Sequence, residues 1–237
     1  VILPYYRKKK FINKTIKSIL NQTYNINELL IIYDDENKNE LKNLIKITEN
    51  NKKIKILVNK KNIGAGESRN RAIKVAKGEY LAFLDADDVW LPGKLMAQIK
   101  EISRGYSFIA TAYVIDDSKT IIQPPVSHDG NLSVFRSLGI LTSSVMIASN
   151  LIAEEKFKHI RFAQDIDLWH RISLLSEFSY CSIRLPFVSY SSGGTTKNKL
   201  TQAIYLWKVM SSNNLAFNKK LNCMNSYFWR GIKNHIL

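Results

Sequence analysis

The chain has 237 residues, of which 45% are hydrophobic and 23% are charged, and its formal net charge at pH 7 is +15. These values match a soluble globular protein with room for one large α/β domain, alone or with an appendage. The longest apolar run, FIATAYVI at 108–115, is far shorter than the roughly 20 residues of a transmembrane helix. Two cysteines, Cys181 and Cys223, exclude a disulfide framework and indicate the reduced thiols of a cytosolic protein.

The first half of the chain alternates strand and helix patterns. Strands are expected at 1–4, 28–35, 53–59 and 80–85, and helices at 11–20, at 41–48 and in the later part of 62–78. The last of these helices follows a glycine-containing loop, NIGAG, and Gly78 is the expected C-terminal cap. Strands separated by helices of this length predict a parallel, doubly wound sheet that is covered on both faces.

The second half is less regular. Strands are expected at 106–115, 119–123, 142–149 and 178–190, a helix at 164–176, and two amphipathic helices after residue 199. We therefore divide the chain into a catalytic-sized domain at 1–198 and a helical segment at 199–237. The domain is further divided into halves at 1–100 and 101–198.

Polar side chains follow three strands of the first half. They are Tyr6 and Arg7 after the first strand, Asp34 and Asp35 after the second, and Asp85, Asp87 and Asp88 after the fourth. Ligands of open α/β sheets bind beyond the carboxyl ends of the strands, so these groups are expected near one another. The start of the helix after the NIGAG loop, which contains Arg69, adds unpaired backbone N–H groups that can bind phosphate. The three carboxylates after the fourth strand repel one another, and a divalent cation between them and a diphosphate would relieve that repulsion. Oxygen-rich sites favour Mg or Mn.

Positive charge gathers in two stretches of the chain. One is the run from Arg7 to Lys10, and the other is the segment after Glu177, which contains eight Lys and Arg residues and no acid. Such segments indicate a polyanionic neighbour, which is nucleic acid, an anionic membrane surface or a phosphorylated ligand. The alternative is a solvated surface that keeps the protein soluble.

Five segments resemble, in this order, the successive motifs of glycosyltransferase family 2. They are VILPYYRKKKFINKTIKSILNQTY, LLIIYDD, NIGAGESRNRAI, GEYLAFLDADDVWLPGKL and QDIDLW. The resemblance is close over about residues 1–100 and looser over 143–190. It implies that the half at 1–100 binds the nucleotide and the half at 101–198 binds the acceptor. It implies an inverting enzyme with the nucleotide-sugar GT-A fold, in which a mixed, mainly parallel sheet carries helices on both faces.

The resemblance also implies a role for each matching residue. Pro4 and Tyr6 would border the base and ribose of a nucleotide sugar, Asp35 would accept the N3–H of uracil or thymine, Arg69 would approach the diphosphate, Asp85 would lie towards ribose and metal, Asp87 would bind the metal directly, and Asp165 would be the general base. The chain departs from many relatives at three positions in two of these motifs, since they have Thr or Ser at position 4, Asn at position 7 and Glu at position 164.

Each of these residues also has a simpler interpretation. Asp34 and Asp35 could form a turn and cap the following helix, and Asp88 could cap a helix that starts near Leu91. Asp167 competes with Asp165 for the role of base. The four histidines, His128, His159, His170 and His235, have no ligand spacing and are expected at the surface or in packing. Residues 190–199, YSSGGTTKNK, suit either a linker or a lid over a diphosphate.

Together these features predict a metal-dependent, hexosyltransferase-like enzyme that uses Mn or Mg. It would move a sugar from a nucleotide diphosphate sugar, with UDP favoured, to a bacterial cell-surface glycan such as a lipooligosaccharide core, or to a lipid-linked acceptor. The alternatives are a nucleotide-sugar-binding relative without transfer activity and a nucleic-acid-binding protein; no nucleic-acid motif is present. The expected location is cytoplasmic, with the basic tail either docked on the anionic inner membrane face or packed on the domain through Trp207 and Phe228.

Overall fold

The computed structural model describes residues 1–126, 134–135, 139–160, 162–191 and 199–236, with side chains for all of these except 199 and 229–236. The glycine-rich part of the expected lid, residues 192–198, and His128 lie outside the described residues. So does the boundary placed at residue 198 between the domain and its tail. The side chains of Arg230, Lys233 and His235 in the tail are likewise outside the description.

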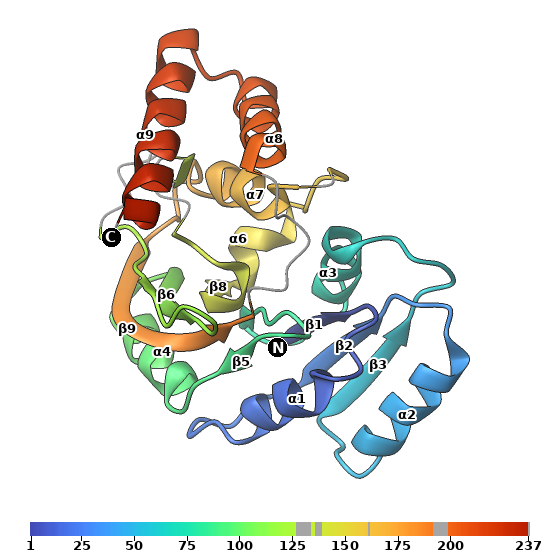
Figure 1. The fold of residues 1–237 in the computed structure, drawn as a ribbon. Helices are drawn as coiled ribbons and strands as arrows, with labels where there is room; N and C mark the ends of the chain where they lie inside the picture. Colours follow the sequence, from blue (N-terminus) through green and yellow to red (C-terminus); the bar gives the residue numbers. More distant parts are fainter. Residues whose placement is uncertain (127–133, 136–138, 161, 192–198, 237) are drawn as a thin grey trace.

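The first half forms a parallel sheet with helices around it (Figure 1). Its elements are β1 (Ile2–Tyr5), α1 (Ile12–Leu20), β2 (Leu29–Tyr33), α2 (Lys38–Thr48), β3 (Ile54–Val58) and α3 (Ala65–Ile73). The strands lie in the order β1-β2-β3, and all five residues of β2 are buried, as expected for the central strand of a parallel sheet. Helix α1 buries Ile12, Ile16 and Ile19, which share one helical face.

A second, mixed sheet completes the domain. Its elements are β4 (Tyr80–Ala82), β5 (Val89–Trp90), α4 (Lys94–Ile102), β6 (Phe108–Ile115), β7 (Ile121–Ile122), η1 (Thr142–Ser144), β8 (Val145–Ala148), α6 (Ser149–Ala153), α7 (Gln164–Ile172) and β9 (Tyr180–Tyr190). The strand order is β4-β8-β6-β9-β5, with β7 on β6. The β6–β9 pair is parallel and the other pairs are antiparallel, so the parallel arrangement belongs mainly to the first half.

The two sheets meet along β1 and β4. An isolated parallel bridge joins Ile2 to Phe83, and the Leu84 N–H donates to the Ile2 carbonyl at 3.0 Å. Pro4 follows on the same side of β1 and has no N–H with which to extend this ladder. Apolar packing continues across the junction, because both large core clusters contain residues from both sheets. The carboxyl ends of β1, β2 and β4 therefore lie at one edge.

Several helix boundaries differ from the sequence prediction, among them the start of α2 at Lys38 and the end of α7 at Ile172. Two further differences have a tertiary cause. Helix α3 ends at Ile73 and not at Gly78, because the chain turns away and the Lys77 N–H donates to Glu28 Oε1 at 2.7 Å. Helix α4 begins at Lys94 and not near Leu91. The Leu91 N–H donates to the Phe187 carbonyl at 2.8 Å, which keeps the chain extended beyond β5. Asp88 therefore does not cap this helix, whose N-cap is Gly93.

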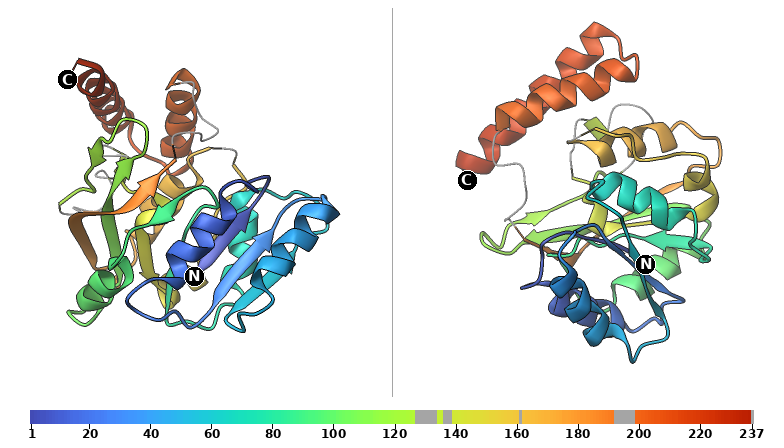
Figure 2. Two further views of the ribbon diagram at one scale, coloured as in Figure 1. Left: turned by 60° about the horizontal axis from the view of Figure 1, so that its bottom comes forward. Right: turned by 90° about the vertical axis from the view of Figure 1, so that its right-hand side faces the viewer.

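Helices α8 (Lys199–Ser212) and α9 (Phe217–Ile236) form a hairpin at the end of the chain (Figure 2). They enclose a small core against the domain, with Ile160, Ala163 and Ile166 of the domain packed beside it. The buried members of that core are Phe135, Leu206, Val209, Met210 and Cys223. Trp207 is partly buried beside this core, whereas Phe228 is 53% exposed. Among the described residues, no helix is both long and apolar enough to cross a membrane.

Candidate active site

Two cavities open at the carboxyl edge of the strands. Their volumes are about 1220 Å³ and about 370 Å³, and both are lined by Tyr6, Asp34, Arg69 and Asp85. The larger one extends to α7 and the smaller one to Lys8, Asp87 and Tyr190. A third cavity of about 510 Å³ lies near the amino ends of β1 and β4, and no predicted site residue lines it. The chemistry is therefore expected in the first two.

The two predicted metal carboxylates are already paired with cations of the protein. The Lys8 ammonium lies 2.5 Å from Asp87 Oδ2, and the Arg69 guanidinium contacts Asp85 Oδ1. Arg69 is buried over the Phe157 ring, and its Nε is without a hydrogen-bond partner in the described part of the chain. These pairs balance the like charges that follow β4.

Asp88 has a different position from its two neighbours. Its side chain is buried, Oδ2 accepts a hydrogen bond from Ser143 Oγ at 2.5 Å, and Oδ1 accepts one from the Ser191 N–H at 3.1 Å. Burial, reinforced by the charge of Asp85, raises the pKa of Asp88 well above its usual value. Asp88 thus ties the loop after β4 to η1 and to the residue that follows β9.

Of the two aspartates after β2, Asp34 lines the cavities and Asp35 is not among their described lining residues. Asp34 accepts hydrogen bonds from Asn59 Nδ2 and from the N–H groups of Ile63 and Gly64, at 2.7 to 2.9 Å. These bonds shape the loop before α3. Gly64 has φ of 88°, which favours glycine, and this loop turns the start of α3 towards the larger cavity.

Asp35 combines the turn role with a second contact. Its Oδ1 accepts hydrogen bonds from the N–H groups of Glu36 at 2.7 Å and Asn37 at 3.2 Å, as the turn interpretation expects. Its Oδ2 lies 3.6 Å from Arg7 Nε. Asn37 then caps α2 with its own side chain, which accepts from the N–H groups of residues 39 and 40. Of the two Asp35 oxygens, Oδ2 is therefore the one that a nucleobase could contact.

Asp165 lies in the first turn of α7 and lines the larger cavity. Thr142 Oγ1 donates to its Oδ2 at 3.1 Å, and the Ile166 N–H donates to its Oδ1 at 2.9 Å. Desolvation by burial raises the pKa of Asp165, and these hydrogen bonds and the Arg69 charge oppose the rise. A carboxylate with a raised pKa is a stronger base than an ordinary aspartate. Ala163, just before the helix, has φ of 59°.

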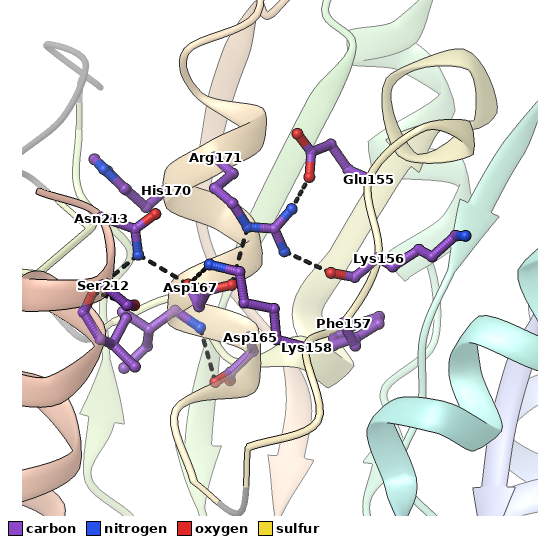
Figure 3. A network of polar contacts seen from close by, with 12 residues as sticks. Glu155, Lys156, Phe157, Lys158, Asp165, Asp167, His170, Arg171, Ser212 and Asn213 are labelled. Atoms are coloured by element: carbon purple, nitrogen blue, oxygen red, sulfur yellow. Dashed lines mark hydrogen bonds and ion pairs between the residues drawn. The ribbon is translucent and has the colours of Figure 1, made fainter.

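Asp167 is the centre of a network of polar contacts away from the cavities (Figure 3). Its fully buried carboxylate accepts from Lys158 Nζ at 2.9 Å, Arg171 Nε at 2.9 Å and Asn213 Nδ2 at 2.8 Å. Arg171 also pairs with Glu155. The network joins α7, the loop before it and the end of α8. Both oxygens of Asp167 are engaged, which leaves it poorly placed to accept a proton from a bound substrate.

Helices α3 and α7 approach closely at the rear of the larger cavity. A Cβ on Gly66, in the first turn of α3, would collide with the Gln164 side chain. Gln164 Nε2 donates to the Ile160 carbonyl, so the residue that replaces Glu of many relatives stabilises the loop before α7. Glycine at position 66 leaves room for the Gln164 amide between the two helices.

The other predicted donor residues lie at the end of β1. Pro4 lines the smaller cavity, and Tyr6 lines both cavities and is 42% exposed. The Arg7 guanidinium lies over the Tyr6 ring at 4.9 Å, and Arg7 itself has φ of 50°. Asparagine, which many relatives have here, tolerates this backbone region better than arginine does.

Sequence reasoning missed several residues of the site. Lys8, Thr142, Lys158 and His159 line one or other cavity. Lys8 belongs to the basic run that begins at Arg7, but its pairing with Asp87 connects two strands that are distant in sequence. Nothing in the sequence pattern distinguishes the other three residues. Of the remaining described histidines, His170 is buried against the Phe135 ring, which agrees with a packing role.

The carboxylates of the site fit a divalent cation whose coordination shell is completed by a bound ligand. Among the described residues there is no group of three or more His, Cys, Asp or Glu side chains that could hold a metal. Asp85 and Asp87 supply two carboxylates at the wall of the smaller cavity. Mg²⁺ in phosphate-binding sites commonly uses one or two carboxylates together with phosphate oxygens and water. The residues present fit such an ion in the company of a diphosphate.

Comparison with known proteins points to one family. The family model for glycosyl transferase family 2 matches residues 1–162. The chain is 29% identical to the Escherichia coli UDP-Glc:alpha-D-GlcNAc-diphosphoundecaprenol beta-1,3-glucosyltransferase WfgD, over 99% of this chain and 94% of that protein. It also matches the curated "Uncharacterized glycosyltransferase MJ1057" of Methanocaldococcus jannaschii with 30% identity, over 97% of this chain and 83% of that protein.

Solved structures share the fold. S. aureus TarS 1–349 in complex with UDP superposes with a TM-score of 0.71 at 16% identity, over 94% of this chain and 68% of that one. The mannosyltransferase PcManGT from Pyrobaculum calidifontis, in complex with GDP-Man and Mn²⁺, gives 0.68 at 14% identity, over 95% of this chain and 67% of that one. The predicted GT-A fold, a mixed α/β architecture with a parallel sheet, is therefore confirmed.

Proposed function

The chain belongs to glycosyltransferase family 2, and we propose that it is an inverting enzyme that moves a sugar from a nucleotide diphosphate sugar to an acceptor hydroxyl. One observation carries this proposal. Arg69, the predicted contact of the diphosphate, and Asp85, which is predicted to lie towards ribose and metal, line the same cavity as Asp165, the predicted base. A donor and an acceptor held in that cavity would react as neighbours, which supplies much of the acceleration in a transfer reaction.

We assign the donor to the edge formed by β1, β2 and β4. Pro4 and Tyr6 would border the base and ribose, Asp35 would accept the N3–H of uracil through Oδ2, Arg69 would approach the diphosphate, and Asp85 would lie towards ribose and metal. The UDP in the TarS complex and the UDP-Glc in the name of WfgD support a uridine donor. For this contact Asp35 must exchange its 3.6 Å contact with Arg7 for the base.

Asp85 and Asp87 would hold a divalent ion, Mn or Mg. The ion, when bound, supplies positive charge that stabilises the leaving diphosphate. Support comes from the two carboxylates at the cavity wall and from the Mn²⁺ in the PcManGT complex. Arg69 reaches the same cavity and adds a fixed positive charge beside the leaving group.

Asp165 would take the proton of the acceptor hydroxyl. The hydroxyl oxygen then attacks the anomeric carbon from the face opposite the diphosphate, which inverts the configuration at that carbon. Thr142 orients the carboxylate through its 3.1 Å hydrogen bond, and the raised pKa of Asp165 brings it nearer to the range in which general bases work.

The acceptor is proposed to be a lipid-linked or cell-surface glycan of a bacterium. The diphosphoundecaprenol acceptor in the name of WfgD supports a lipid-linked substrate. The tail hairpin exposes apolar residues beside basic ones, namely Leu200, Ile204, Lys208, Phe217, Lys219, Leu221 and Phe228. An apolar stripe with lysines and no acid suits the anionic inner face of a cytoplasmic membrane, with the enzyme itself cytoplasmic and peripheral.

Sedimentation with liposomes of increasing anionic lipid content tests the membrane contact. Binding should rise with anionic lipid, fall at high salt, and fall when Leu221 and Phe228 are both replaced by Ser, since these side chains lie outside the buried core of the hairpin. Binding that ignores lipid charge, or an unchanged affinity of the double variant, would leave packing of the tail on the domain as its role.

The transfer activity is tested with Asp87→Asn. We expect this variant to fold, to lose metal-dependent transfer and to bind nucleotide sugar more weakly, because one of two metal carboxylates is gone. A panel of nucleotide sugars with and without Mn²⁺, read as a shift in the unfolding temperature, identifies the donor. Donor binding without any turnover in the wild-type protein would favour a nucleotide-sugar-binding relative. No nucleic-acid partner is proposed.

A further inference from the structure

We propose that Lys8 is a donor-binding residue that changes partners: its ammonium rests on Asp87 in the free protein and moves to the diphosphate when donor and metal bind. This inference rests on the proposed function, because it assumes that Asp87 binds a cation and that a diphosphate lies in the cavity. It assigns to the free protein a built-in cation that the metal must displace.

The resting contact is direct and crosses the junction of the two sheets. Lys8 follows β1, Asp87 follows β4, and Nζ and Oδ2 are 2.5 Å apart. Both residues line the cavity of about 370 Å³, together with Arg69 and Asp85. The Lys8 side chain is 32% exposed and that of Asp87 is 13% exposed, so the pair lies at the wall of the cavity and in reach of an entering ligand.

A dication and an ammonium compete for the same carboxylate. At the separation seen here, the ammonium neutralises and occupies the carboxylate oxygen that a metal ion would bind. Two cations beside one carboxylate also repel each other. Metal binding to the free protein therefore has to separate Lys8 from Asp87. A lysine is suited to such a change, because its flexible four-carbon stem carries three donors that are not fixed in direction.

Lys8 differs in this respect from Arg69, the second cation at the site. Arg69 is buried and lies over the Phe157 ring, with Cζ 5.2 Å from its centre. A guanidinium that is fixed in this way can receive a phosphate but has little room to move away. Lys8 lies farther from an aromatic ring, with Nζ 5.8 Å from the centre of the Phe11 ring, and it reaches into the cavity from an exposed loop.

The exchange predicts cooperation between metal and donor. A metal that binds alone loses free energy by breaking the Lys8–Asp87 pair. With a nucleoside diphosphate present, the released ammonium gains charged phosphate oxygens as new partners. Each ligand should therefore raise the affinity of the other, and by the same factor. Without Lys8, the metal should bind the free protein more tightly and the nucleotide should bind the metal-loaded protein less tightly.

The experiment compares wild type with Lys8→Gln, and uses Lys9→Gln as control. Lys9 is exposed, is not among the described residues that line either cavity, and loses the same charge on substitution. Binding of Mn²⁺ to the free protein is measured by the electron paramagnetic resonance signal of unbound Mn²⁺. Binding of UDP at saturating Mn²⁺ is measured by calorimetry. Circular dichroism melting confirms that each variant is folded.

We expect opposite effects in the two measurements. Lys8→Gln should tighten Mn²⁺ binding by about three- to tenfold and weaken UDP binding by about the same factor, the range of a partly exposed ion pair. Lys8→Arg should keep both wild-type affinities to within a few-fold, and Lys9→Gln should change neither. Weaker binding of both ligands, or no change, in a folded Lys8→Gln protein would overturn the inference while leaving the proposed function intact. No Mn²⁺ binding by the wild type, even with UDP present, would overturn the inference together with the metal assignment of Asp85 and Asp87 in the proposed function.

Discussion

At the end of β4, Asp85 and Asp87 pair with Arg69 and Lys8 at the wall of a cavity, whereas Asp167 in α7 pairs with Lys158 and Arg171 through a fully buried carboxylate. Both regions pair carboxylates with Lys or Arg side chains, yet the pairs differ in what they can do. A pair that a ligand can reach can exchange partners. A pair that is buried and fully bonded leaves an uncompensated charge when it is broken, which costs several kcal/mol.

Asp165 shows how sharply the two regions are separated. It lies two residues from Asp167 and on the same helix, yet its carboxylate lines the larger cavity and receives a single side-chain hydrogen bond, from Thr142, in the described part of the chain. Successive residues of a helix point in different directions, so neighbouring acids can serve a cavity and a core. Burial and bonding of each carboxylate, and not its place in a motif, distinguish the two roles.

The largest expected effect comes from Asp165→Asn. Loss of a general base should lower the turnover number by roughly 10²- to 10⁴-fold, while donor affinity stays near that of wild type. The unfolding temperature should not fall, because the amide replaces a carboxylate whose charge is costly to bury. Steady-state transfer kinetics and donor calorimetry check this. If Asp165→Asn turns over normally and Asp167→Asn does not, the two roles have to be exchanged.

Asp167→Asn should instead affect stability. The substitution removes the anionic partner of Lys158 and Arg171, and we expect the free energy of unfolding to fall by about 2 to 3 kcal/mol. The estimate lies at the low end for buried pairs because the Lys158 side chain is 41% exposed and can return to water. Urea unfolding measures the change, and the turnover of folded protein should stay within tenfold of wild type. An unchanged unfolding midpoint would contradict the structural role.

Asp35→Ala sharpens the comparison within the donor edge. A charged acceptor of one base hydrogen bond is worth about 1.5 to 3 kcal/mol, so the affinity for UDP should fall by roughly tenfold or more. The metal dependence should change little, because Asp35 is remote from Asp85 and Asp87 in the contacts described. Calorimetry with UDP measures the loss. Equal affinities of variant and wild type would mean that Asp35 serves only its turn and Arg7.

The pH dependence of stability should also distinguish Asp165. Its pKa in the folded protein is raised above the usual 3.8, so the folded state binds more protons than the unfolded state in the range just above that value. Stability from this group is therefore largest below pH 3.8 and falls as pH rises through the folded-state pKa. Asp165→Asn should lack this component. The unfolding free energies of wild type and Asp165→Asn are measured from about pH 3 upward. A difference between them that does not change with pH would contradict the raised pKa.

The smallest effect is expected from Ala163→Gly, at the residue that precedes α7. Ala163 has φ of 59°, where glycine has no steric penalty. Relief of this strain is opposed by the greater freedom of glycine in the unfolded chain, and the net gain in stability should be at most about 1 kcal/mol. Thermal unfolding measures it. A clear loss of stability would show that packing of the Ala163 methyl group contributes more free energy than the backbone strain costs.

The carboxylates of the site could be located from the sequence because strand ends in a parallel sheet share one edge. Asp85 and Asp87 follow a strand that is almost entirely apolar, and the position of strand ends in open α/β sheets predicts that they lie near Tyr6. The same rule could not choose between Asp34 and Asp35, which lie next to each other. Their difference depends on the loop at 59–64, whose amide groups face Asp34 alone.

Other features depend on contacts that no sequence period contains. Lys8 and Asp87 are brought together by the junction of two sheets, and Thr142 reaches Asp165 from the segment before β8. The boundaries of α3 and α4 are displaced by single tertiary hydrogen bonds, to Glu28 and to Phe187. Helical propensity and capping residues describe a helix in isolation, so such bonds lie beyond them.

The junction between β1 and β4 has a consequence for temperature. Backbone hydrogen bonds there are sparse, because Pro4 cannot extend the ladder, and the alignment of the two sheets depends on apolar side chains such as Ile2 and Phe83. Hydrophobic stabilisation weakens on cooling. The two edges that carry Lys8 and Asp87 should therefore be held together less firmly near 0 °C than at ambient temperature.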